Sequence, residues 1–182
     1  MDNTAAYYVR ITLTTPSMTS ADKKAGKSTT HTEVLLEVHP EWAPFGAARF
    51  RMLVENQFFV GSSFHCAIPG FILQFGLHAD PQTGYQWRMP IADEDEAVLR
   101  QSNTEGTVAF VSTGPNTRCC ALVVNMCDNS KPGASPLSFA TQHVFMTAMC
   151  CKQVPTCETL SMSKALCHLG ALLGVQHILL QL

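Results

Sequence analysis

The sequence predicts a mainly β fold, in which a closed barrel of strands is capped by two helices. Short runs rich in β-branched, aromatic and other apolar residues recur along the chain, separated by Gly, Pro and Asn. Only two stretches are predicted as helices. The length of 182 residues, with no internal repeat and no linker, fits one domain that covers residues 1–182.

The first two predicted strands form a hairpin around a polar insertion. Residues 7–13 and 32–38 show the alternation that is typical of half-buried strands. Residues 14–31 between them are polar and hold three of the six lysines. We interpret this insertion as a solvated loop. The alternative is a contact arm for an anionic partner.

A helix is predicted after the hairpin, and most of the strands follow it. Pro44 favours a helix start, and Ala47, Phe50 and Leu53 recur on one face of the segment 43–56. A second, short helix is expected at 156–163. The other strand-like runs are residues 62–68, 70–75, 106–112, 120–126, 143–149 and 175–182.

The low content of charged residues excludes some function classes. Only 14% of the residues are charged, and the net charge is -2. These values exclude a disordered polar chain and a basic nucleic-acid-binding arm, and we see no specific signal for nucleic acid. A surface so poor in Lys and Glu predicts contact with protein partners in a larger assembly.

The eight cysteines are predicted to be reduced thiols. No CxxC motif occurs, and the adjacent pairs Cys119-Cys120 and Cys150-Cys151 have a poor geometry for a tetrahedral metal site or a local disulfide. We therefore expect no metal and no other cofactor. Free thiols, and an N-terminus without the apolar core of a signal peptide, predict an intracellular, reducing compartment, either cytoplasmic or cytoskeletal.

The C-terminal segment 165–182 is apolar and holds no formally charged residue. Its eighteen residues reach the lower limit for crossing a membrane, but two His, two Gln and two Gly dilute it. We interpret it as a buried loop followed by a closing strand at 175–182. The alternative is a tail anchor, and no membrane span is expected.

Residues 64–76, FHCAIPGFILQFG, resemble the FHR-x-IPGF-x-x-QGG signature of the cyclophilins, which are peptidyl-prolyl isomerases. Residues 106–110 (GTVAF) and 114–117 (GPNT) resemble two further cyclophilin motifs, GT-x-x-M-A and GPNT. The likeness extends from Tyr7 to the closing strand. It implies an eight-stranded antiparallel barrel with a helix capping each end, and a groove for proline-containing peptides.

The resemblance also implies a degenerate catalytic site. Cyclophilin catalysis is attributed to an arginine that donates to the prolyl nitrogen during rotation about the Xaa-Pro bond. Cys66 stands at the position of that arginine, Ala121 replaces a groove glutamine, and no residue is assigned a catalytic role. The remnants of the peptide groove are expected at His65, Phe71, Ile72, Gln74, Val111, Val123 and His143.

These residues leave three functions open. The favoured prediction is a catalytically degenerate cyclophilin-like protein that acts as a structural or protein-binding subunit of a larger assembly. The first alternative is a weak or substrate-restricted isomerase, in which Arg118 or Arg88 supplies the missing donor. Each of these arginines has a second interpretation, as an exposed loop residue. The last alternative is redox or metal chemistry through Cys66.

Overall fold

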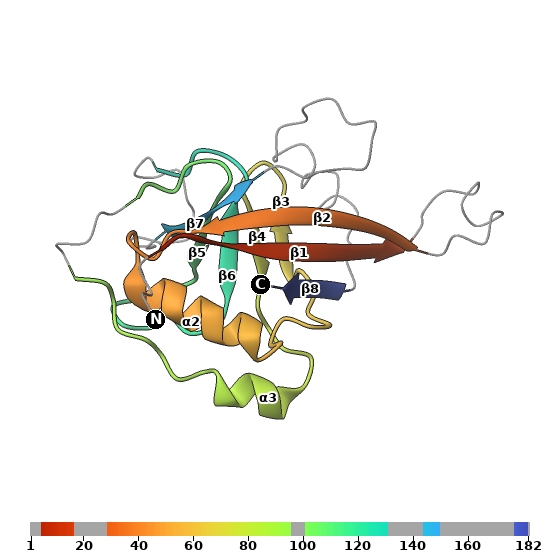
Figure 1. Cartoon of the computed structure of the whole chain (residues 1–182), viewed down its shortest axis with the longest axis horizontal. Coiled ribbons are helices and arrows are strands. Elements are labelled where there is room, and N and C mark those ends of the chain that lie inside the picture. The colour runs from red at the N-terminus through yellow and green to blue at the C-terminus, as the bar shows by residue number, and fades with distance from the viewer. Residues whose placement is uncertain (1–4, 17–28, 96–100, 131–143, 150–176, 182) are drawn as a thin grey trace.

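The computed structural model describes residues 5–16, 29–95, 101–130, 144–149 and 177–181, which form a mainly β fold with two helices (Figure 1). The prediction of a mainly β chain is confirmed, and of the two described helices the first coincides with a predicted one. The elements in chain order are β1 (Tyr7–Pro16), β2 (Thr29–Val38), α2 (Pro44–Glu55), β3 (Cys66–Ile68), β4 (Ile72–Phe75), α3 (Pro81–Gln86), β5 (Thr107–Phe110), β6 (Leu122–Asn125), β7 (Val144–Met149) and β8 (His177–Gln181).

The strands form one antiparallel sheet in the order β3-β4-β6-β5-β7-β2-β1-β8. Each of the eight predicted runs coincides with one of these strands. The predicted closed barrel needs correction, because within the described residues no pairing joins the two end strands, β3 and β8. These are short strands of three and five residues, which offer little backbone edge for a closing ladder.

The first hairpin is longer than predicted. Its register runs from Tyr7 opposite Val38 to Pro16 opposite Thr29, so each strand extends three residues into the predicted insertion. Threonine favours strands, and Thr14 Oγ1 lies 3.1 Å from His31 Nδ1 across the hairpin. The rest of the insertion, residues 17–28, lies outside the described part of the chain.

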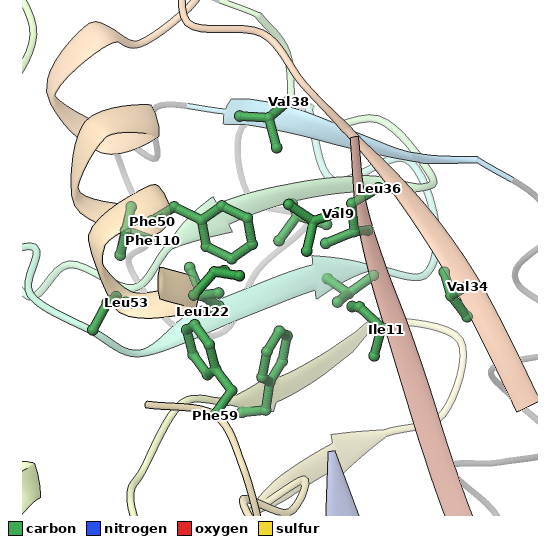
Figure 2. Close-up of a cluster of buried hydrophobic side chains, with 14 of the residues drawn as sticks. Val9, Ile11, Val34, Leu36, Val38, Phe50, Leu53, Phe59, Phe110 and Leu122 are labelled. Atoms are coloured by element: carbon green, nitrogen blue, oxygen red, sulfur yellow. The ribbon is translucent and has the colours of Figure 1, made fainter. Parts of the chain in front are cut away.

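Helix α2 packs one face against the sheet, as its spacing predicts. Its buried residues include Ala47, Phe50 and Leu53, and the fully buried Phe50 lies among side chains from β1, β2, β5 and β6 (Figure 2). Burial of one such side chain stabilises the fold by about 1.5–3 kcal/mol. We call the cluster of buried apolar side chains that contains Phe50 the main core. It packs α2 against the sheet.

Helix α3 was not predicted. Its six residues are too few for a helical repeat, but Asp80 and Pro81 are a start signal, because Asp80 accepts hydrogen bonds from the backbone N–H groups of Gln82 and Thr83. The two described helices lie at the same side of the sheet (Figure 1). The helix predicted at 156–163 lies outside the described residues.

The strand predicted at 175–182 is present as β8, at the edge of the sheet and not as the closing strand of a barrel. Strand β8 pairs with β1, so that Ile178 lies opposite Leu13 and Leu180 opposite Ile11. Within the described ranges, no helix has both the length and the apolar character that a membrane crossing requires.

Candidate functional site

A row of directly paired residues crosses four strands at the centre of the site. Cys66 of β3 lies opposite Gln74 of β4, Gln74 lies opposite Val123 of β6, and Val123 lies opposite Ala109 of β5. Directly opposed residues of an antiparallel sheet share one face. Their neighbours Leu73, Leu122 and Val108 belong to the main core, so the row lies on the other face of the sheet.

A second, smaller apolar cluster covers this face. Its buried members are Ile72, Ala109 and Val123, and Trp42, Phe71 and Val111 are partly buried against them. The structure therefore brings together four of the residues at which the groove was expected, namely Phe71, Ile72, Val111 and Val123. We call the whole set the outer cluster; its six residues are Trp42, Phe71, Ile72, Ala109, Val111 and Val123.

The floor of the outer cluster is closed. Ile72 is 1% exposed and Val123 is 0% exposed, so neither presents a surface to a ligand. Phe71 and Val111 keep partial exposure above this floor. A proline ring placed here would contact the partly exposed side chains of Phe71 and Val111 rather than enter a pocket between Ile72 and Val123.

Polar groups fix the position of Phe71. Its carbonyl oxygen accepts hydrogen bonds from Met126 N at 2.8 Å and from Asn129 Nδ2 at 3.2 Å. Asn129 Nδ2 also donates to Asn125 Oδ1 at 2.9 Å, and Asn125 Nδ2 donates to Thr107 Oγ1 at 2.9 Å. Sequence reasoning missed this chain of amides, for which the only signal is an Asn at the end of a buried strand.

His65 and Gln74 form the polar border of the site beside Cys66. The backbone N–H of His65 donates to the Gln74 carbonyl at 3.1 Å, while the Gln74 and Cys66 side chains are partly exposed. Desolvation lowers the pKa of His65 below its ordinary value, although the residue keeps exposed surface. Only the Cys66 thiol stands where the resemblance implies an arginine donor, whereas His65 and Gln74 stand at positions where the resemblance implies the same residues.

Arg118 does not supply the missing donor, and it is not an exposed loop residue. Its side chain is 0% exposed, with Nη1 3.1 Å from Glu94 Oε1 and Nε 3.3 Å from Asp93 Oδ1. Nη2 donates to the Ala92 carbonyl oxygen. Both sequence interpretations of Arg118 are wrong, because two carboxylates distant in sequence hold its guanidinium inside the protein.

Glu94 connects this ion pair to helix α2. Its side chain is 1% exposed, and its carboxylate accepts hydrogen bonds from Gly46 N at 2.9 Å and Phe45 N at 3.1 Å. Carboxylates stabilise the positive end of a helix dipole, and this one replaces a cap that Ala43 cannot provide. The guanidinium of Arg118 therefore stabilises the folded structure through these contacts and does not face a peptide.

The other sequence candidates fall in different places. Arg88 is exposed, as one interpretation expected, and its charge acts on the thiol of Cys120 in the main core. His143 lies outside the described residues. Among those residues, Cys66, Cys119, Cys120 and Cys127 are free thiols, and no group of three or more His, Cys, Asp or Glu could hold a metal ion.

Sequence reasoning also missed Trp42 as a member of the outer cluster. It stands two residues before α2, and its ring stacks on His39 with the centroids 3.8 Å apart. A tryptophan just before a helix gives no local signal that it will pack against strands β4 to β6. Its place depends on how the chain turns between β2 and α2.

Comparison with known protein families gives a match for residues 27–143, which agrees with the resemblance seen in the sequence motifs. This segment matches the model of the family described as cyclophilin type peptidyl-prolyl cis-trans isomerase/CLD. The match includes strands β2 to β6, both described helices and every expected groove residue.

Individual relatives carry the same description. The chain is 32% identical over 101 residues to a peptidyl-prolyl cis-trans isomerase of Acinetobacter baylyi, which is 55% of this chain and 53% of that protein. It is 32% identical over 100 residues to peptidyl-prolyl cis-trans isomerase-like 3 of Rhizopus delemar, covering 49% of this chain and 58% of the relative. The chain thus matches only about half the length of these curated relatives.

Proposed function

Because the chain belongs to the cyclophilin-type peptidyl-prolyl cis-trans isomerase family, we propose that it is a catalytically degenerate member, which binds protein segments through the outer cluster without efficient isomerisation. The observation that carries this proposal is that no arginine stands at the expected position of the donor. Cys66 occupies this position, and Arg118, one of the two candidate donors, is fully buried between Asp93 and Glu94. A structural or protein-binding subunit of a larger assembly needs no such donor.

The chemistry of isomerisation explains why the donor matters. Rotation about an Xaa-Pro bond has a barrier of about 18–20 kcal/mol, set by amide resonance. A charged donor aimed at the prolyl nitrogen weakens that resonance, and such preorganised donors are typically worth about 10²–10³ in rate. A neutral thiol is a weak donor, so Cys66 cannot replace the guanidinium.

The burial of the floor of the outer cluster also supports binding without efficient isomerisation. Because Val123 and Ile72 are buried, the accessible contacts on this face are Phe71, Val111 and Trp42 of the outer cluster, together with the Gln74 amide beside the cluster. A shallow apolar surface with one amide suits an extended segment that contains proline. It does not hold the proline ring in the fixed orientation that lowering a rotational barrier requires.

One observation favours the alternative, a weak or substrate-restricted isomerase. Gln74 and Phe71 remain on the outer face, and the Phe71 carbonyl is held by two hydrogen bonds. A peptide bound there in a twisted state would show some acceleration even without a charged donor.

Titration of the ¹⁵N-labelled protein with an Ala-Pro peptide tests peptide binding. We expect the backbone signals of Phe71, Gln74 and Val111 to shift, and the Phe71→Ala variant to lose these shifts. Phe45→Ala is the matched control, because Phe45 is an exposed phenylalanine at the start of α2, outside the outer cluster. Shifts that persist in Phe71→Ala, or no shifts in the wild type, would contradict binding at this face.

A further inference from the structure

Two adjacent thiols, Cys119 and Cys120, precede strand β6, and neither belongs to the outer cluster. The Sγ atoms of Cys119 and Cys120 lie 3.8 Å apart, and both thiols are free. Cys120 is 5% exposed and belongs to the main core, whereas Cys119 is partly exposed at its border. A small reagent from solvent therefore reaches Cys119 first and finds a second sulfur within contact distance.

Several donors converge on the sulfur of Cys119. This sulfur shares a hydrogen bond with the Cys120 thiol, the backbone N–H groups of Cys120 and Ala121 donate to it, and the charge of Arg49 acts on it as well. Successive N–H groups that point at one atom form an anion-binding arrangement. Arg49 is itself held in place, because Nη2 donates to the Met89 carbonyl at 3.1 Å and the guanidinium lies 5.7 Å from the Trp87 ring centroid.

These contacts divide the pair into a thiolate and a thiol. The hydrogen bond between the two thiols, followed by the backbone N–H groups, lowers the pKa of Cys119 to about 6. The same hydrogen bond, together with burial, raises the pKa of Cys120. At neutral pH the accessible sulfur is therefore the nucleophile and the buried one keeps its proton.

We propose that Cys119 and Cys120 form a redox modification site for hydroperoxides, in which Cys119 is the attacking sulfur and Cys120 is the resolving one. The Cys119 thiolate attacks the peroxide, an S–O bond forms, the O–O bond breaks, and an alkoxide or hydroxide leaves. Oxidation removes the charge on Cys119 that helps to hold the proton on Cys120. The Cys120 sulfur then loses this proton and attacks the Cys119 sulfur, so that the S–S bond forms, the S–O bond breaks, and the hydroxyl group leaves with the proton as water. Overall, two thiols are oxidised to a disulfide, and ROOH is reduced to ROH and H₂O.

The adjacency of the two cysteines, which predicted a poor geometry for a local disulfide, makes this disulfide strained and labile but does not prevent it, because the two sulfurs already lie 3.8 Å apart. The two sulfurs must approach from 3.8 Å to about 2.05 Å, which requires rotation of both side chains and adjustment of the backbone, because the bond closes a small ring through one peptide group. Adjacent Cα atoms are only about 3.8 Å apart, below the usual range for a disulfide of about 4.4–6.8 Å. Such a bond is strained and easily reduced, so the site is a reversible modification rather than a structural crosslink.

Peptide mapping of the full chain tests the proposal directly. The reduced protein is treated with H₂O₂ at pH 7, blocked with N-ethylmaleimide, and cleaved with trypsin and an Asp-specific protease, which release residues 119–127. We expect this peptide to lose two hydrogens and carry one adduct, on Cys127, and to carry three adducts if dithiothreitol precedes blocking. Three adducts without reductant, a bond to another cysteine, or sulfinic acid at Cys119 would overturn the proposal.

Cys127 is an internal control in the same peptide. Burial and the charges of Asp128 and Glu105 raise its pKa, so its thiolate fraction is small at pH 7. Alkylation of Cys119 should level off above a midpoint near pH 6, whereas alkylation of Cys127 should rise about tenfold per pH unit between pH 6 and 8. Parallel pH profiles for the two cysteines would contradict the assignment of Cys119 as the attacking thiolate.

Single variants separate the two roles. Cys120→Ser should stop disulfide formation and leave a sulfenic acid at Cys119 that dimedone traps. Cys127→Ser should leave the rate of disulfide formation unchanged. Disulfide loss in Cys127→Ser, or no dimedone adduct in a folded Cys120→Ser protein, would refute the proposed division of roles. None of these measurements depends on peptide binding by the outer cluster.

Discussion

Arg118 is held at the residue scale by contacts that belong to the fold. Its guanidinium faces two carboxylates and a backbone carbonyl in a site with no exposed surface. Removal of one partner of a buried ion pair leaves the other charge without compensation, which typically costs about 3–5 kcal/mol. The residue therefore contributes to stability and is not available to a peptide.

We predict that Arg118→Met lowers the free energy of unfolding by about 3–5 kcal/mol, because it leaves Glu94 charged and buried. The double variant Arg118→Met/Glu94→Gln should recover part of this loss, since no buried carboxylate then lacks a counter-charge. Urea unfolding measures both effects. Arg10→Gln is the control, because Arg10 and Glu33 are 59% and 53% exposed, and its cost should not exceed about 1 kcal/mol.

His65 gives a prediction for pH. Desolvation places its pKa below the ordinary value of 6.5 in the folded state, so the unfolded chain binds a proton first as the pH falls. Stability should therefore decline below pH 6.5 and level off below the folded pKa of His65. His65→Gln should make this decline smaller in urea unfolding between pH 7.5 and 5. An unchanged pH dependence in the variant would contradict the depressed pKa.

At the element scale, Gly76 sets the distance between the end of β4 and the segment before β6. Its φ is +101°, and a Cβ at this position would lie 2.4 Å from the Cys120 carbonyl oxygen and 3.0 Å from the Ala121 Cα. Both contacts are with backbone, which cannot move aside as a flexible side chain does. The two strands can therefore approach this closely only with glycine at this point.

We predict that Gly76→Ala destabilises the protein severely, by more than the roughly 1–2 kcal/mol that a left-handed backbone alone costs an L-residue. Gly70→Ala is the matched control, since Gly70 also has a positive φ, +68°, but no atom lies within 4 Å of its added Cβ. Gly70→Ala should show only the smaller, conformational cost in urea unfolding. Equal costs for the two variants would contradict the role of the close approach.

The sequence predicted elements well where the signal is local. All eight strand positions and α2 follow from alternation, helical spacing and a proline at a first turn. Helix α3 was missed because six residues without a buried side chain carry no periodic pattern, and only Asp80-Pro81 indicates its start. The hairpin strands were drawn too short, because their polar threonine ends pair through the backbone rather than through apolar side chains.

At the scale of the whole molecule, local patterns were not enough to describe the site. The motif at residues 64–76 placed Phe71, Ile72 and Gln74 on or next to one predicted strand. The pairing of β4 with β6 then brings Val123 opposite Gln74. The burial of Ile72 and Val123 depends on packing across several elements, as does the burial of Arg118 by carboxylates 24 and 25 residues earlier in the chain. No spacing within a motif reports such contacts.

The central claim is that this cyclophilin-family chain binds proline-containing segments without efficient isomerisation. NMR exchange spectroscopy on an Ala-Pro peptide, with catalytic and then saturating amounts of the wild-type protein, tests it most directly, because shifts report binding and exchange peaks report isomerisation. We predict shifts of the peptide signals without accelerated cis-trans exchange. Accelerated exchange that Phe71→Ala abolishes and Phe45→Ala preserves would contradict this claim and establish the outer cluster as a working isomerase site.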